Sequence, residues 1–198
     1  AHLPQELARS FIEGTLRDED RAVYRGHKSV IYRCFERNES LPNGEGVKFQ
    51  VDYRKYKNPT PDTPDQMRFE YTQTDEGSPG EEHLVAEMHL GIIDSRTFIL
   101  KHRYTQPAVG QNKGIGTKLF LHAEEWLQQV AQETGYDVTI NARTGQQDVI
   151  GWLQKLGFVV EEKQAALLEE IQEHPEHFIV ADADNVDNDG IKRRMYIF

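Results

Sequence analysis

A short glycine-containing segment, from Gln111 to Gly116, has the residue types that could bind a phosphate. It lies between a strand-like stretch and a long helical pattern, and Lys113 and Lys118 add positive charge. Glycine lets the backbone approach a ligand closely. The N–H groups at a helix start, together with the positive end of the helix dipole, favour an anion. The segment therefore predicts binding of a phosphate or pyrophosphate, and the alternative is a plain glycine-rich turn that enters a helix.

Two common nucleotide-binding motifs do not fit this segment. In a Walker loop the second glycine comes five residues after the first and is followed by lysine, whereas Gly114 comes four residues after Gly110 and is followed by Ile115. A dinucleotide-binding fingerprint needs a third glycine after Gly116, and none follows at the required spacing.

The pattern Gln-x-x-Gly-x-Gly, read at Gln111, Gly114 and Gly116, resembles the acyl-CoA motif of the GNAT superfamily of N-acetyltransferases. Pro107 stands about where that family has a proline. Residues 149–158 (VIGWLQKLGF) resemble the second acyl-CoA motif, and RMYIF at 194–198 resembles the last strand of the family. The resemblance covers about residues 83–160 and the final strand.

This resemblance implies that acetyl-CoA is the cosubstrate, held in an opening between two parallel strands, here 97–105 and 137–142. Backbone N–H groups of the glycine-containing segment would hold the pyrophosphate, and backbone near Tyr104 or Thr105 would stabilise the oxyanion of the tetrahedral intermediate. Gln146 stands about where the family has an asparagine before the second helix. The residues expected to bind the cofactor are Thr105, Gln111, Asn112, Lys113, Gly114, Ile115, Gly116, Thr117 and Gln146.

The transfer reaction also needs acid–base groups. A lysine-like amine, with a pKa of about 10.4, must lose a proton before it can attack. Glu87 is the expected base, because it alternates onto the non-apolar face of the strand 83–93 together with His83 and His89. The alternative is an ordinary solvated strand face.

A departure from the family pattern concerns the acid that protonates the leaving thiolate. Leu153 stands where many members have tyrosine. Tyr104 or Tyr136 could replace it, and Glu87 and Tyr104 are the expected catalytic residues. The same departure favours a protein that binds CoA without catalysis.

No metal site is expected. Asn185, Asp187, Asp189 and Gly190 imitate the start of a calcium loop, but Tyr196 takes the place of the final glutamate. A proline interrupts the histidine and glutamate residues at 173–177, and the sequence contains no H-E-x-x-H motif.

Periodicity predicts the elements that must position these residues. The fold class is a mixed α/β (α+β) domain like that of the GNAT superfamily. Its central twisted sheet is mostly antiparallel, has one parallel pair splayed at the acyl-CoA site, and is flanked by helices. Helices are expected at 4–16, 115–133, 147–156 and 165–173. Strands are expected at 29–36, 46–56, 66–74, 83–93, 97–105, 137–142, 158–160, 177–181 and 191–198.

Length and composition limit the classes of protein. The 198 residues, 37% of them hydrophobic, suit one globular domain, residues 1–198, with an acyl-CoA core at 82–160 and an acceptor-side half at 1–81. The net charge of −10 argues against nucleic-acid binding. No apolar run is long enough to span a membrane and no signal peptide is seen, so a cytoplasmic protein without a membrane partner is expected.

These observations predict an N-acetyltransferase that moves an acetyl group from acetyl-CoA to a primary amine of a small molecule or peptide. The acidic balance favours a cationic acceptor. Because members of the GNAT superfamily are often dimers, a homodimer is one expectation. Two alternatives stay open: a GNAT-like module that binds CoA or a partner protein without catalysis, and a sensor of phosphate ligands.

Overall fold

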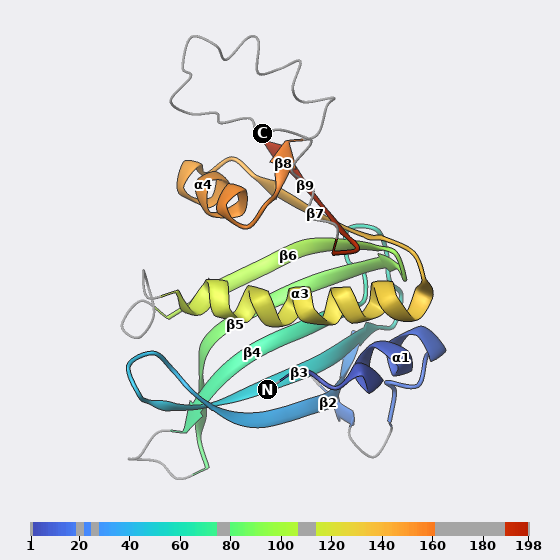
Figure 1. Cartoon of the computed structure of the whole chain (residues 1–198). Coiled ribbons are helices and arrows are strands. Elements are labelled where there is room, and N and C mark those ends of the chain that lie inside the picture. The colour runs from blue at the N-terminus through green and yellow to red at the C-terminus, as the bar shows by residue number, and fades with distance from the viewer. Residues whose placement is uncertain are drawn as a thin grey trace.

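The computed structural model describes residues 2–18, 22–24, 28–74, 80–106, 114–160 and 189–197. Within these ranges the chain forms a mixed α/β fold, with one large, mostly antiparallel sheet of nine strands and three helices (Figure 1). No helix among these residues has the length and apolar character needed to cross a membrane.

The helices are α1 (Gln5–Glu13), α3 (Ile115–Thr134) and α4 (Gln147–Lys155). The strands are β1 (Ala22–Tyr24), β2 (Ser29–Ser40), β3 (Gly46–Tyr56), β4 (Gln66–Thr74), β5 (Glu82–Asp94), β6 (Thr97–Thr105), β7 (Val138–Thr144), β8 (Val159–Val160) and β9 (Ile191–Ile197).

The strands follow the order β1-β2-β3-β4-β5-β6-β7-β9-β8. The first six form an antiparallel meander, which agrees with the expected antiparallel character of the sheet. Parallel pairing is more extensive than the single pair expected. It joins β6 to β7 and continues from β7 to β9 and from β9 to β8, toward the edge of the sheet.

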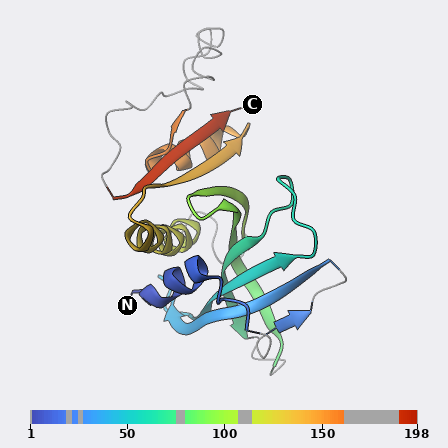
Figure 2. The same ribbon diagram turned by 90° about the vertical axis from the view of Figure 1, so that its right-hand side faces the viewer.

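Alternating side chains give the meander two different faces. Phe49, Val51, Phe69 and Met88 are on the face that packs against α3 and are almost completely buried. The α3 side chain Trp126 meets Phe69, with ring centroids 6.2 Å apart. Figure 2 shows α1 and α3 together on this side of the sheet. The opposite face carries polar side chains from β2 to β6.

Helix α3 crosses the sheet and ends at Gly135, which has a left-handed φ of +74°. Its N-terminal half packs against α4, where the rings of Phe120 and Trp152 have centroids 5.8 Å apart. Because α4 follows β7 directly, this contact ties β7 to the start of α3.

A β-bulge changes the faces predicted for β5. Ala86 pairs with Tyr71 but Leu84 pairs with Thr72, so Val85 is an extra residue in the ladder. Such a bulge reverses the alternation on one side of it. Leu84 therefore lies on the polar face and Val85 is buried. His83 loses the face it was expected to share with Glu87.

Other differences concern the ends of elements. The strand expected at 29–36 continues to Ser40, and the strand expected at 137–142 runs from Val138 to Thr144. The helix expected at 165–173 and the strand expected at 177–181 lie outside the described residues.

Candidate functional site

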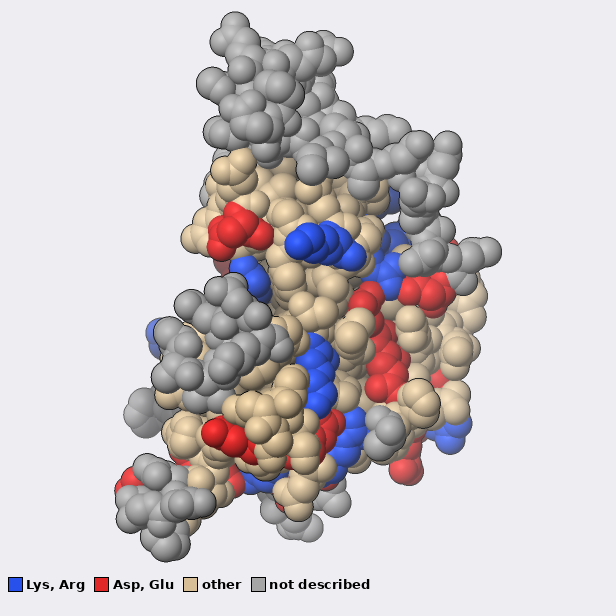
Figure 3. Space-filling view, turned by 60° about the vertical axis from the view of Figure 1, so that its left-hand side comes forward, with Lys and Arg blue, Asp and Glu red and all other residues tan. Residues whose placement is uncertain are grey.

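The start of α3 lies against the end of β6. Gly114 is the N-cap of α3 and has a φ of +75°, and the first turn of the helix contains no acidic residue. A Cβ atom placed on Gly116 would lie 3.6 Å from Thr105 Oγ1. The backbone N–H groups of the first turn are therefore next to the last residue of β6. Figure 3 turns this end of the molecule forward and shows acidic and basic side chains interspersed over it.

Three side chains join α3, α4 and β6 near this end. Trp152 donates a hydrogen bond from Nε1 to Thr117 Oγ1, at 2.9 Å. The guanidinium of Arg103 lies over the Trp152 ring, 4.4 Å from its centroid. Burial lowers the pKa of Arg103, and the nearby Asp148 carboxylate opposes that shift. The arrangement places a cation beside the last residues of β6.

The parallel pairing of β6 with β7 covers only part of β6. It runs from Thr97 with Thr139 to Leu100 with Ala142, and residues 101–105 have no register partner in β7. Gln106 donates its N–H to Val85 O on β5, at 2.8 Å. Because successive N–H groups of a strand point to opposite sides, the N–H of Thr105 points toward the side of β7.

The other predicted cofactor-binding residues differ in whether the structure describes them and in whether their side chains are buried or exposed. Gln111, Asn112 and Lys113 lie outside the described residues. Ile115 is buried in the core, so only its backbone could meet a ligand. Gln146 is the exposed N-cap of α4 at the end of β7, and its side chain makes no capping hydrogen bond.

Two positions bear on the expected acid. Leu153 is 1% exposed and belongs to the core, so this position does not face a ligand. Tyr136 follows the C-terminal end of α3, a helix of 20 residues. At a rise of about 1.5 Å per residue, roughly 30 Å separates it from Gly114. Tyr104 is therefore the better placed of the two tyrosines.

The two predicted catalytic residues are register partners. Glu87 on β5 pairs with Tyr104 on β6. Side chains directly opposite each other on an antiparallel pair are on the same face, with Cβ atoms about 5 Å apart. Tyr104 is 42% exposed, and Thr105, beside α3, is the next residue in the chain. The structure thus brings Glu87 to the end of β6 that meets α3.

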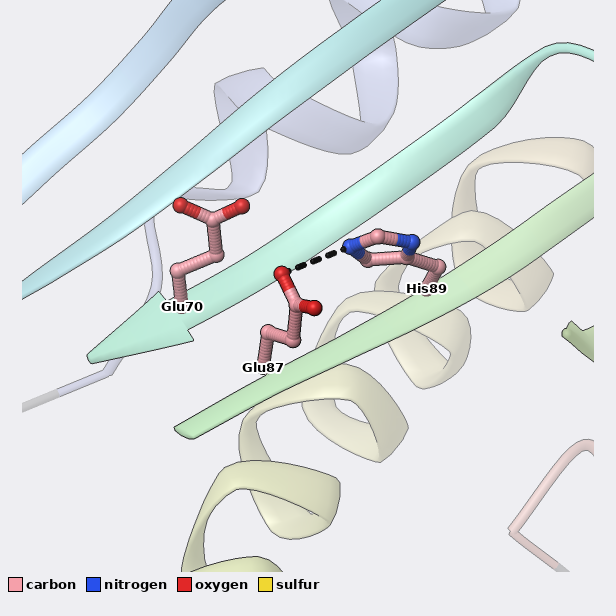
Figure 4. Close-up of side chains that lie close together, drawn as sticks. All are labelled: Glu70, Glu87 and His89. Atoms are coloured by element: carbon pink, nitrogen blue, oxygen red, sulfur yellow. Dashed lines mark hydrogen bonds and ion pairs between the residues drawn. The ribbon is translucent and has the colours of Figure 1, made fainter. Parts of the chain in front are cut away.

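Glu87 belongs to a polar cluster formed by Arg68, Glu70, Glu87 and His89, which we call the β4–β5 cluster. Figure 4 shows Glu70, Glu87 and His89 on the side of the sheet away from α3. His89 Nε2 lies 3.2 Å from Glu87 Oε2. Arg68 contacts the other three residues: its Nη2 lies 2.7 Å from Glu70 Oε1 and 3.5 Å from Glu87 Oε2, and its Nε donates to His89 Nε2 at 3.0 Å.

The cluster belongs to two rows of register partners that cross the polar face. One row contains Glu36, Gln50, Glu70, Glu87 and Tyr104. The other contains Arg33, Asp52, Arg68 and His89. Neighbouring rows therefore carry mostly opposite charges. Burial raises the pKa of Asp52, and the Glu70 carboxylate adds to the rise while Arg33 opposes it.

A metal ion is a further reading of this cluster. One ligand atom from each of Glu70, Glu87 and His89 lies within 4.8 Å of the others. The Arg68 guanidinium, however, contacts both carboxylates and the imidazole. It already supplies the positive charge that a metal would bring, so the donor set does not fit a metal ion well.

Sequence reasoning missed Gln50, Arg68 and Glu70. The signal that could have found them is the alternation of polar with apolar residues in 66–74 (QMRFEYTQT), which puts Arg68 and Glu70 on one face. The position of this face opposite Glu87 depends on strand register, which the alternation does not give.

Comparisons with protein families, curated proteins and solved structures find no match to this chain.

Proposed function

We propose that this protein is an acyl-CoA-dependent N-acyltransferase of the GNAT type that transfers an acetyl group to a primary amine. The observation that carries the proposal is the junction of β6 with α3. Pairing of β6 with β7 stops at Leu100, and the next residues of β6 lead to a helix N-terminus that contains no acidic residue. This supports a splayed parallel pair with an anion site at its end.

The residues at this junction suit the chemistry of acetyl-CoA. The cosubstrate supplies an activated thioester carbonyl and a pyrophosphate. The first-turn N–H groups at Gly116 and Thr117 hold the pyrophosphate, helped by the positive end of the α3 dipole. The N–H of Thr105, directed toward β7, donates to the carbonyl oxygen as negative charge develops on it. Gln146, at the end of β7, lies on the other side of the opening.

The acid and base come from the polar face. Glu87 accepts the proton that the amine loses, with His89 next to it. The amine nitrogen bonds to the acetyl carbon as the carbon–sulfur bond breaks, and the thiolate leaves with the electron pair. Tyr104, opposite Glu87, donates a proton to that thiolate and is reprotonated from solvent.

Binding of acetyl-CoA tests the proposal through substitutions at Gly116. A Cβ at this position makes only ordinary van der Waals contact with Thr105 Oγ1, so a Cβ can be added without displacing Thr105. Aspartate in the first turn stabilises a helix but repels a pyrophosphate. We expect Gly116→Asp to bind acetyl-CoA at least about tenfold more weakly in calorimetric titration, since one lost charge-assisted hydrogen bond is worth that much.

Gly116→Asn has almost the same size without the charge and is the matched control. It should retain most of the affinity of the parent protein. Equal affinities of the aspartate and asparagine variants would overturn the assignment of the pyrophosphate to α3.

A second candidate function is CoA binding without catalysis. The observation that favours it is the buried Leu153 at the position of the family tyrosine. Release of free CoA from acetyl-CoA in the presence of amines separates the two functions. Amine-dependent release supports transfer, whereas binding of acetyl-CoA without release supports the second candidate.

A further inference from the structure

The protonation state of His89 follows from its contact with Arg68. Arg68 Nε donates a hydrogen bond to His89 Nε2 at 3.0 Å, and both side chains are buried in the β4–β5 cluster. A guanidinium has only donors and stays protonated in proteins. The ring nitrogen that receives this bond must therefore carry a lone pair, because a protonated Nε2 would set one N–H against another. His89 is thus neutral, with its proton on Nδ1.

The Nδ1–H tautomer determines what His89 can do to Glu87. Glu87 Oε2 lies 3.2 Å from the same Nε2 atom (Figure 4). Without a proton on Nε2, the imidazole cannot donate to the carboxylate from this atom. A hydrogen bond donated to a carboxylate stabilises its charged form and makes it a weaker base. Because His89 does not donate that bond, Glu87 keeps more of its capacity to accept a proton.

Arg68 is held in its orientation by Glu70. Arg68 Nη2 lies 2.7 Å from Glu70 Oε1, and Gln50 Nε2 donates to Glu70 Oε2 at 2.8 Å. Both carboxylate oxygens of Glu70 are thereby engaged, and all three residues are buried. Charge-assisted contacts of this kind restrict the planar guanidinium to few orientations. The contacts from Gln50 through Glu70 therefore fix the direction in which Arg68 Nε points.

Strand register accounts for the contacts of Arg68 across the ladder. Arg68 and His89 are register partners on β4 and β5, as are Glu70 and Glu87. Partners lie on the same face, and diagonal neighbours are within reach of a long side chain. The diagonal contact from Arg68 Nη2 to Glu87 Oε2 is 3.5 Å long, compared with 2.7 Å to Glu70. Arg68 therefore acts on Glu87 mainly through His89.

We propose that Arg68 is a positioning residue that fixes His89 in its Nδ1–H tautomer and so prevents the imidazole from donating to Glu87. In the proposed N-acyltransferase this prepares Glu87 to accept the proton that the amine loses. The N–H bond of the ammonium breaks, its electron pair stays on nitrogen, and an O–H bond forms at Glu87. The role in the reaction rests on the proposed function, whereas the tautomer of His89 does not.

Heteronuclear NMR of the histidine ring nitrogens tests the tautomer, because their couplings to the ring protons differ between the Nδ1–H and Nε2–H forms. Spectra are recorded at about pH 8, where an ordinary histidine, with a pKa of about 6.5, is neutral. The loss of signals in His89→Gln identifies those of His89. We expect the Nδ1–H form. The Nε2–H form in the parent protein would overturn the proposal, and this result needs no variant at Arg68.

Arg68→Met removes the donor to His89. We expect His89 to change to the Nε2–H form in this variant, because that form can donate to Glu87 Oε2. Arg33→Met is the matched control, since Arg33 is an arginine of the same face whose ion pair is with Asp52, at 2.6 Å. It should leave His89 in the Nδ1–H form. The Nδ1–H form in Arg68→Met would show that Arg68 does not set the tautomer and would overturn the proposal.

Release of CoA from acetyl-CoA, with n-butylamine as the amine, tests the role in the reaction. We expect Arg68→Met to lower kcat at least about tenfold, since the charge-assisted hydrogen bond that His89 then donates to Glu87 is worth roughly that factor. The KM for acetyl-CoA should not change. An unchanged kcat in a variant whose His89 has changed tautomer would overturn the positioning role. Failure of the parent protein to release CoA would refute the proposed function instead, and the spectra would still decide the tautomer.

Discussion

Arg193 on β9 forms a buried ion pair with Glu124 and so links β9 to α3. It is 8% exposed, donates from Nε to Glu124 Oε2 on α3 at 2.7 Å, and donates from Nη1 to Asp189 Oδ1 at 3.3 Å. Removing one partner of a buried ion pair leaves an uncompensated charge, which costs about 3–5 kcal/mol. We expect Arg193→Met to lower the free energy of unfolding by about 3 kcal/mol in urea denaturation.

The matched control is the next residue along the strand. Lys192 is exposed, and Lys192→Met should change the free energy of unfolding by less than about 0.5 kcal/mol. A similar loss in both variants would show that the side-chain stems matter, and not the ion pair.

A second prediction at this scale concerns His122 on α3. Its imidazole stacks on Phe49 and lies 3.2 Å from Glu39 on β2. Burial lowers the pKa of His122 from 6.5, and Glu39 opposes the shift while Arg37 adds to it. The unfolded chain therefore takes up a proton at higher pH than the folded chain, so the free energy of unfolding falls as the pH falls through about 6.5.

His122→Gln removes this titration. Between about pH 7 and pH 5.5 its free energy of unfolding should decline less steeply than that of the parent protein, as urea titrations at each pH can measure. His2→Gln, at an exposed histidine, is the control. The carboxylate of Glu39 titrates at lower pH and does not contribute to this slope. Burial favours a raised pKa for Glu39, but His122, Arg37 and Tyr71 outweigh it and lower the pKa below 4.5. An unchanged slope in His122→Gln would show that other groups set the pH dependence.

The sequence was enough to predict the sheet face of some residues but not of others, and it did not predict their partners on the neighbouring strands. The alternation of residues 83–93 was enough to put Glu87 on a polar face, and the structure agrees. It could not predict that Tyr104 lies opposite Glu87, because register depends on pairing between strands. It also gave His83 the wrong face, since a bulge at Val85 leaves no clear mark in the sequence.

At the scale of elements, two glycines of different helices should respond in opposite ways to replacement by alanine, because one ends its helix and the other lies inside it. Gly135 ends α3 with a φ of +74°, a conformation that costs an alanine about 1 kcal/mol or more. Gly151 is inside α4, and a Cβ there would meet no atom within 4 Å. Alanine is a better helix former than glycine by up to about 1 kcal/mol.

We therefore expect Gly135→Ala to lower the melting temperature and Gly151→Ala to raise it, as measured by circular dichroism. Changes of the same sign would show that the left-handed cap at Gly135 and the helix interior at Gly151 do not control these positions.

Elements were predicted well where the pattern is local. The apolar spacing of α3 and the alternation of β3 and β4 depend on neighbouring residues, and their predicted bounds are close to those observed. The order of the strands in the sheet depends on contacts between residues that are far apart in the sequence. Nothing in the residues of β9 shows that it pairs with both β7 and β8 in parallel, and the start of the glycine-containing segment lies outside the described residues.

For the whole molecule, one sheet unites the polar face with the junction of β6 and α3. The clustered side chains of the polar face come from β3, β4 and β5, and the residues at the junction come from β6, α3 and α4. Both groups therefore depend on a continuous ladder through β5 and β6.

The place of β9 also bears on the order in which the chain can fold during synthesis. β9 inserts between β7 and β8, although it follows both in sequence. Strands β1 to β6 can pair with neighbours as each hairpin leaves the ribosome, but the edge of β7 that faces β9 stays open until residues 191–197 emerge. Arg193 lies in the same segment, so its ion pair with Glu124 of α3 also forms only after this segment has been synthesised. The last strand to join the sheet is thus the one that pairs with β7 and carries the Arg193 contact to α3.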